Sequence, residues 1–224
     1  MRYIFLLLAC SLLVLCSCGT ENQQQDTLGN TKIDSLQAVQ EEPLRTSYSE
    51  EADTAIFAQA FNQFFSAMQS GDTVALNNFI DPKQGFWVIE QPGAMPAYTH
   101  YKVIQKVRRK YQNKPFTSIT EEVKQCQLVQ REELPNFDCG AMDQGRSGFT
   151  EEGCFYTTQT KDFRHTDMWK YANLSNQRAE QVQDMQEQVD ITVLHTATSY
   201  RFHFGYRNGS WRLFFADLRV PCSA

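Results

Sequence analysis

The chain has 224 residues, a formal net charge of −5 and an isoelectric point near 5.4. The length suits one domain with a sizeable core. The acidic balance argues against nucleic acid as a partner, and we expect the basic run 106–110 to be a solvated helix face. The absence of P-loop, G-x-S-x-G, G-x-G-x-x-G and H-E-x-x-H motifs argues against several large enzyme classes.

The amino terminus predicts export and a lipid anchor. The apolar run 4–15 is shorter than the roughly 20 residues of a membrane-spanning helix and has the flanks of a secretory signal. It leads into Leu15-Cys16-Ser17-Cys18-Gly19, which resembles the bacterial lipobox. The resemblance implies a signal peptide over 1–17 and acylation (palmitate) of Cys18, which would hold the protein in the bacterial cell envelope, at the outer membrane. An ordinary cleaved secretory signal is the alternative.

Residues 18–49 are expected to form a flexible tether, and residues 50–224 the folded domain. The tether is polar and poor in aromatic residues, so it buries too little to offset the entropy of ordering. Within it, Asp26-Thr27-Leu28 and Asp34-Ser35-Leu36 are similar to the O-glycosylation site of some anaerobic Gram-negative bacteria.

Four cysteines fall in the expected domain. An even number in an exported domain predicts two disulfides, and four cysteines allow three pairings. We favour Cys139–Cys154 across a polar loop and Cys126–Cys222 from the last strand to a central one. A metal site is the alternative, but no C-x-x-C or H-x₃-H spacing supports it, and we expect neither a metal nor a cofactor.

Helices dominate the first half of the expected domain. Apolar residues recur every three or four positions over 51–70, Gly71 ends that helix, and Asp72 caps a second one over 73–79. A third helix is predicted over 98–111. The other predicted elements are strands at 86–89, 123–131 and 154–160, a long loop at 134–153 and a polar helix at 175–188.

The carboxyl end predicts a long hairpin. The alternating residues 190–206 form one strand, 210–220 the next, and Asn208-Gly209 is the strongest short hairpin signal. This register pairs Phe204 with Leu213, Phe202 with Phe215, and Tyr200 with Asp217. A one-residue slip would exchange the two faces. The buried face then carries Tyr200, Phe202, Phe204, Tyr206, Trp211, Leu213 and Phe215, and the opposite face carries Arg201, His203, Arg212 and Phe214.

Helices followed by a long meander indicate an α+β fold. The opening segment 64–72 and the closing Gly209-Ser210-Trp211-Arg212-Leu213 resemble the ends of nuclear-transport-factor-type and SnoaL-like (cystatin-like cone) domains. The resemblance implies amino-terminal helices packed on a curved antiparallel sheet that forms a half-open cone. The overall pattern also resembles uncharacterised lipoproteins of anaerobic Gram-negative bacteria, which implies no activity.

Asp217 is the candidate catalytic carboxylate, because the predicted register places it on the aromatic face opposite Tyr200. A carboxylate in an apolar cone has a raised pKa and can act as a general base or acid. Enzymes of the resembling family place an acid–base pair there, and His100 is the histidine best placed at the mouth of the cone. The alternative is a structural Asp217 that bonds a backbone amide or Tyr200.

Ligand-binding residues are expected around the loop 91–98, which two prolines stiffen. Trp87, Met95 and Tyr98 would supply its apolar lining; a packed loop that closes the core is the alternative. His195 and His203 share one face of the predicted strand, roughly 26 Å apart, which is too far for one metal.

Three functional hypotheses follow. The first is a non-enzymatic module that binds a small apolar ligand or a protein segment. The second is a small hydrolase or isomerase that uses Asp217 with Tyr200 or His100. The third is an envelope-assembly subunit whose partner docks around Arg201, His203 and Arg212. The fold alone decides between none of them.

Overall fold

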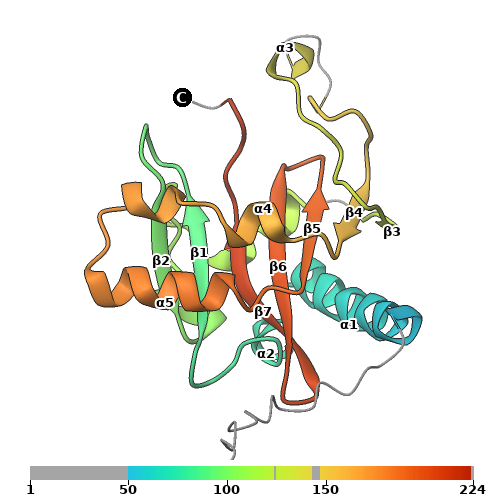
Figure 1. The fold of residues 1–224 in the computed structure, drawn as a ribbon, viewed down its shortest axis with the longest axis horizontal. Coiled ribbons are helices and arrows are strands. Elements are labelled where there is room, and N and C mark those ends of the chain that lie inside the picture. Colours follow the sequence, from blue (N-terminus) through green and yellow to red (C-terminus); the bar gives the residue numbers. More distant parts are fainter. Residues whose placement is uncertain (1–49, 124, 143–146, 223–224) are drawn as a thin grey trace, which may run out of the picture. The chain divides into compact units, whose positions relative to one another are not determined.

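The computed structural model describes residues 50–123, 125–142 and 147–222 (Figure 1). The predicted signal peptide, Cys18 and the tether lie outside these residues. The described residues all belong to one compact unit. Within the described ranges, no helix is both long enough and apolar enough to cross a membrane.

A seven-stranded sheet with the order β2-β1-β7-β6-β5-β4-β3 forms the centre of the fold. The α+β class is confirmed. The sheet is mixed rather than wholly antiparallel, because β1 runs parallel to β7 and β3 runs parallel to β4. Its strands are β1 (Phe86–Glu90), β2 (Ala97–Tyr101), β3 (Leu128–Gln130), β4 (Cys154–Thr157), β5 (Ile191–His195), β6 (Tyr200–Arg207) and β7 (Ser210–Asp217).

Helical segments contact both faces of the sheet. Side chains of α1 pack with one face, which we call the aromatic face, and α5 packs on the other, which we call the pocket face. Figure 1 shows α4 and α5 in front of the sheet on the pocket face. The helices are α1 (Glu50–Ser70), α2 (Thr73–Asn77), α3 (Cys139–Met142), α4 (Lys161–Arg164) and α5 (Asn176–Gln186), with 3₁₀ segments η1 (Ile104–Lys106), η2 (Phe116–Glu121) and η3 (Met168–Tyr171).

The aromatic face is packed with phenylalanine rings. Phe57, Phe61 and Phe64 follow one another at helical spacing on α1, and each is at most 2% exposed. Their rings meet Phe204 on β6 at centroid distances of 5.3–6.3 Å, all edge to face. Such pairs gain about 0.5–1.5 kcal/mol beyond the area that they bury. This face is therefore a filled core.

Several predicted elements are confirmed, with bounds that differ by a few residues. Asp72 caps α2 by accepting the amides of Val74 and Ala75, both at 3.0 Å. Ser175 caps the predicted polar helix, which is α5. The predicted strands at 86–89 and 154–160 are β1 and β4, whereas the one at 123–131 shrinks to the three residues of β3.

The predicted helix over 98–111 is wrong. Residues 97–101 form β2, which pairs with β1 along its whole length. Between β2 and residue 111, the only helical segment is the 3₁₀ turn η1. The segment is rich in aromatic and β-branched residues, which suit a pleated sheet. The basic run is consequently not a helix face. Its residues Lys106, Arg108 and Lys110 are exposed as expected, but Arg109 is 6% exposed and forms ion pairs with Glu90 and Glu122.

The predicted strand over 190–206 is two strands. A turn at 196–199 folds β6 back on β5, so that His195 pairs with Tyr200 and Thr192 with His203. Ser199 adopts a left-handed φ of 64°. His195 therefore lies on the aromatic face, 6.3 Å from the Phe65 ring, whereas His203 lies on the pocket face. The prediction that they share one face at 26 Å is wrong.

The Asn208-Gly209 turn is confirmed, and both residues have positive φ. The predicted pairs Tyr206–Trp211 and Phe204–Leu213 are present. Beyond them the register shifts by one residue, because Phe214 is an extra residue in β7 and forms a β-bulge.

The bulge overturns the rest of the predicted register. Phe202 pairs with Ala216 rather than Phe215, and Asp217 pairs with Arg201 rather than Tyr200. Phe214 and Phe215 both belong to the cluster under α5. Phe214 covers Gly205, where a Cβ atom would collide with its ring.

Two disulfides are present, but their pairing differs from the predicted one. Cys126 joins Cys154, and Cys139 joins Cys222. Cys126 precedes β3, whose first residue pairs with Cys154, so the parallel β3–β4 pair brings these cysteines together. The sequence contained no information on this parallel pairing.

We expect Phe204→Ala to lower the free energy of unfolding by about 3–5 kcal/mol, because it removes the ring that three α1 phenylalanines contact. Urea denaturation measures the change. The control is Val74→Ala at a side chain that is 72% exposed, which should change stability by less than about 0.5 kcal/mol. Equal effects would contradict the packing described here.

We expect peptide mapping without reduction to recover Cys139 linked to Cys222. In the chain-entropy model, a link across a sequence separation of 83 residues stabilises the fold by about 4.5 kcal/mol, so Cys139→Ser with Cys222→Ser should lower the melting temperature. A peptide that links Cys139 to Cys154 would show that the pairing is wrong.

Candidate functional site

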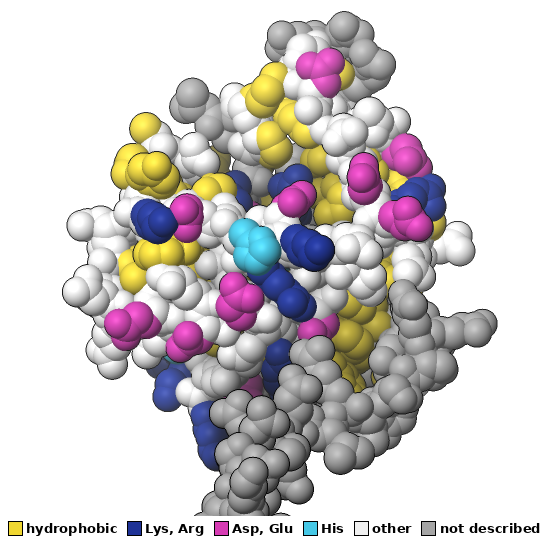
Figure 2. All heavy atoms as spheres, viewed as in Figure 1, with side chains coloured by type: hydrophobic (Ala, Val, Ile, Leu, Met, Phe, Trp, Pro, Cys, Tyr) yellow, Lys and Arg dark blue, Asp and Glu magenta, His cyan; other side chains and the backbone are white. Residues whose placement is uncertain are grey.

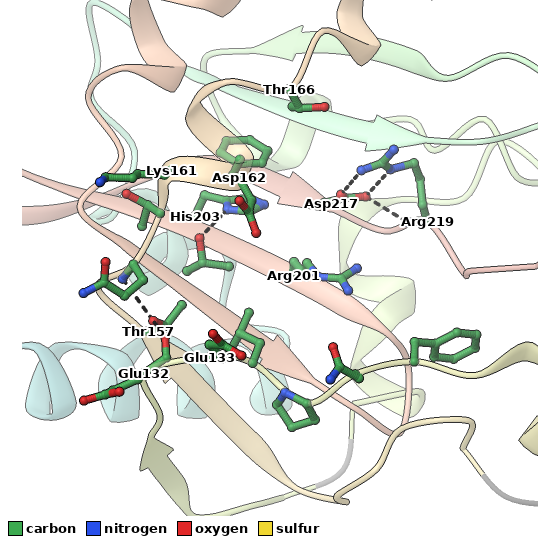
Figure 3. Close-up of a pocket in the computed structure, with 18 of the residues that line it drawn as sticks. Glu132, Glu133, Thr157, Lys161, Asp162, Thr166, Arg201, His203, Asp217 and Arg219 are labelled. Carbon is green, nitrogen blue, oxygen red and sulfur yellow. Dashed lines mark hydrogen bonds and ion pairs between the residues drawn. The ribbon is translucent and has the colours of Figure 1, made fainter.

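A pocket of about 850 Å³ lies on the pocket face, over β5, β6 and β7. The segment 132–137 forms one wall and α4 the other (Figure 3). On this face, charged side chains of both signs gather around the position of α4 (Figure 2). Arg201, His203, Asp217 and Arg219 form the floor of the pocket, and the exposed residues Glu132, Glu133, Lys161 and Asp162 form its rim.

Asp217 is bound by Arg219 at the floor. The Arg219 Nε donates to Asp217 Oδ1 at 2.7 Å, and the second guanidinium nitrogen binds Oδ2. Burial alone would raise the pKa of Asp217, but the hydrogen bonds and charge of Arg219, with smaller contributions from His203 and Arg201, hold it below its usual range. The expectation of a raised pKa is therefore wrong, and Asp217 is an ionised anchor for Arg219.

His203 is buried at 1% exposure beside this pair. Its Nδ1 lies 2.9 Å from Thr192 Oγ1, and the Phe163 ring stacks on the imidazole with a centroid distance of 3.5 Å. Burial lowers the pKa of His203 to about 3, so the ring is neutral at pH 7. Its Nε2 is buried and has no hydrogen-bond partner.

Arg201 is half-buried and lies opposite Asp217 in the β6–β7 register. No described residue forms a hydrogen bond or ion pair with its guanidinium. Burial lowers the pKa of Arg201 while the charge of Asp217 raises it, and an arginine remains charged in proteins at neutral pH. The pocket therefore contains a cation whose five N–H donors are unused by the rest of the described chain.

The structure does not bring the three predicted catalytic residues together. Tyr200 lies on the aromatic face, where it binds Glu122 and accepts a hydrogen bond from Arg109 at 3.2 Å. Burial and the hydrogen bond to Glu122 raise its pKa to about 12. His100 lies on β2, with Nε2 2.6 Å from the Gln84 carbonyl oxygen, and its pKa is lowered by burial. Asp217 has neither of them as a partner.

The predicted ligand-binding residues are also dispersed. Trp87 and Tyr98 are buried in the cluster under α5, and both the Trp87 Nε1 and the Tyr98 hydroxyl lack a hydrogen-bond partner. Met95 is 53% exposed in the loop between β1 and β2. Trp87 and His100 line a second pocket of about 510 Å³ beside α5, where Arg178 lies over the indole ring.

One group of potential metal ligands occurs among the described residues. Ligand atoms of Cys126, Cys154 and His195 lie within 4.8 Å of one another. The two cysteines form a disulfide, and a disulfide sulfur is not the thiolate that binds metals.

The sequence did not reveal that Arg201 and Arg219 lie together in a pocket. The predicted register placed Arg201 and His203 on a solvated outer face of the sheet. In the structure, α4 and the segment 132–137 cover this face. The signal that could have found them is the spacing: Arg219 follows Asp217 by two residues, and both Arg201 and His203 alternate with core aromatics on one strand.

Comparison of the chain with protein-family models, curated proteins and solved structures finds no match. The resemblance to nuclear-transport-factor-type domains thus stays a prediction.

We expect the stability of the protein to fall as the pH drops from 6.5 towards 3, because His203 accepts a proton only in the unfolded chain over this window. The loss due to His203 is about 1.4 kcal/mol per pH unit. Asp217, whose pKa is also lowered, loses its contribution only as the pH falls below the value of an unfolded aspartate, about 3.9.

Urea denaturation between pH 6 and 4.5 measures this slope. His203→Gln cannot titrate, so its slope should be shallower than that of the wild type by about 1.4 kcal/mol per pH unit. The control is His165→Gln at an exposed position. Identical slopes in wild type and His203→Gln would mean that His203 is not held neutral by the fold.

Proposed function

We propose that this chain is a cell-envelope lipoprotein, held at the outer membrane by lipid on Cys18, whose domain binds a small polar ligand and catalyses no reaction. The observation that carries the proposal is the unpaired guanidinium of Arg201 in a ligand-sized pocket. We infer further that the sheet is curved like the half-open cone of nuclear-transport-factor-type domains, with the ligand on its outer rather than its inner face.

An anionic group on the ligand fits Arg201. Removing a charged donor from water costs free energy unless it regains hydrogen bonds, and a planar guanidinium binds a carboxylate through two parallel bonds. The charge of Asp217 acts on Arg201 from across the strand pair, but its carboxylate forms hydrogen bonds with Arg219 and none with Arg201. The buried, unpartnered Nε2 of His203 offers a further polar contact in the same pocket.

The site geometry favours binding over the two rival functions. An acid–base reaction needs Asp217 near Tyr200 or His100, and these three side chains lie apart. A flat docking face needs Arg201, His203 and Arg212 side by side on the surface. Instead, His203 is buried and Arg212 donates to the Asn78 carbonyl oxygen at 2.6 Å. The charged lining likewise favours a polar ligand over the apolar one expected from the sequence.

We expect butanoate to bind the full chain through Arg201. In a nuclear magnetic resonance titration, the Arg201 Nε–H signal should shift saturably, because a carboxylate accepts its hydrogen bond. The control reporter is Arg131, which forms an ion pair with Glu151 and does not line this pocket. Arg201→Met should abolish the binding seen at neighbouring amides. A titration that shifts neither Arg201 nor its neighbours would contradict the proposed site.

A further inference from the structure

We propose that the ligand of this pocket is a zwitterion, a molecule that carries a carboxylate and an ammonium group, as a free amino acid does. The inference rests on the function proposed above and names its ligand class. The carboxylate binds Arg201 at the floor, and the ammonium group lies between the acidic side chains of the rim.

The charges of the pocket are separated by depth. At the floor, the two arginines Arg201 and Arg219 face the single carboxylate Asp217, which leaves an excess of one positive charge. His203 adds no charge at neutral pH, because burial lowers its pKa to about 3. Since Arg219 is bound to Asp217, the excess positive charge resides on Arg201.

The rim has the opposite sign. Three exposed carboxylates face one exposed ammonium group there, which leaves an excess of two negative charges. No described residue forms a hydrogen bond or ion pair with these carboxylates or with that ammonium group. The carboxylates belong to Glu132, Glu133 and Asp162, and the ammonium group to Lys161.

Each of the two walls contributes a carboxylate to the pocket that contains Arg201. Glu133 belongs to the segment 132–137 and Asp162 to α4, which form opposite walls of the pocket. In Figure 3 the Asp162 and Glu133 carboxylates both lie to the left of the Arg201 side chain, whose guanidinium extends to the right, and Lys161 lies farther from Arg201 than either carboxylate. A ligand whose carboxylate binds Arg201 could therefore direct a cationic group towards acidic side chains from both walls.

This arrangement selects against ligands with a single kind of charge. A dicarboxylate would satisfy Arg201 but bring its second carboxylate against the acidic rim. A simple amine would satisfy the rim but leave Arg201 unpaired. Discrimination of this kind combines attraction with repulsion, and only a ligand that carries both charges gains at both levels.

Calorimetric titration of the full chain at pH 7 with four probes of equal carbon number tests the inference. Butanoate carries only the carboxylate and butylamine only the ammonium group, whereas 2-aminobutanoate and 4-aminobutanoate carry both at two separations. We expect at least one aminobutanoate to bind at least tenfold more tightly than butanoate, and butylamine not to bind.

Variants test whether the rim carboxylates bind the ammonium group of the ligand and Arg201 binds its carboxylate. Glu133→Gln combined with Asp162→Asn should reduce the preference for the aminobutanoate to less than threefold without weakening butanoate, because only the ammonium contact is lost. Glu180→Gln, an exposed carboxylate on α5 outside this pocket, is the matched control and should keep the preference. Arg201→Lys, which keeps the charge, should bind every carboxylate more weakly and remain folded.

The outcomes separate the two proposals. If butanoate binds as tightly as both aminobutanoates, or if the rim variant keeps the full preference, the zwitterion inference is overturned and the binding pocket stands. If none of the four probes binds, both are overturned.

Discussion

The extra residue in β7 determines which side chains reach each face of the sheet. Side chains alternate between faces along a strand, so one additional residue at Phe214 reverses the assignment of every residue that follows it. Ala216 then packs with the aromatic core, and Phe215 and Asp217 lie on the pocket face. Without the bulge, the Asp217 carboxylate would point towards the aromatic face instead of into the pocket. The Arg219 ion pair, the stacking of Phe163 on His203 and the pocket itself all depend on this shift.

Different interactions stabilise the two faces of the sheet. On the aromatic face, ring contacts and apolar burial stabilise the attachment of α1. On the pocket face the buried pair Asp217–Arg219 adds little net stability, because desolvation of both ions opposes their attraction. The Asp217–Arg219 pair is better explained as a positioning device. It holds the side chains at the floor of the pocket in one arrangement and leaves Arg201 available to a ligand.

Local signals in the sequence predicted those parts of the fold that depend on nearby residues. The helical stripe of α1, the caps at Asp72 and Ser175, and the Asn208-Gly209 turn each follow from residues close together in the chain. The β-bulge could not be predicted from nearby residues, because the apolar side chains of the run 213–216 suit either face of the sheet. The turn at 196–199 also escaped prediction, since it contains neither glycine nor proline and the alternation continues through it.

The same limit applies to the site. The sequence identified Asp217 as a carboxylate in an unusual environment, but its partners depend on register and on segments that arrive from elsewhere. Segment 132–137, α4 and the residues after β7 are far apart in the chain, and no periodic pattern connects them. Disulfide pairing, too, depended on a parallel strand pair that no local signal reveals.

The Cys139–Cys222 disulfide has a consequence for the timing of maturation. It joins α3, which follows the wall 132–137, to the tail that follows Arg219, and so closes a covalent loop over 139–222 that contains α4 and the charged floor. Thiols stay reduced in the cytoplasm and become oxidised after export. In a protein exported as proposed here, the last link of the pocket would form only outside the cytoplasm. The chain would then cross the inner membrane without cargo and first meet its ligand in the envelope.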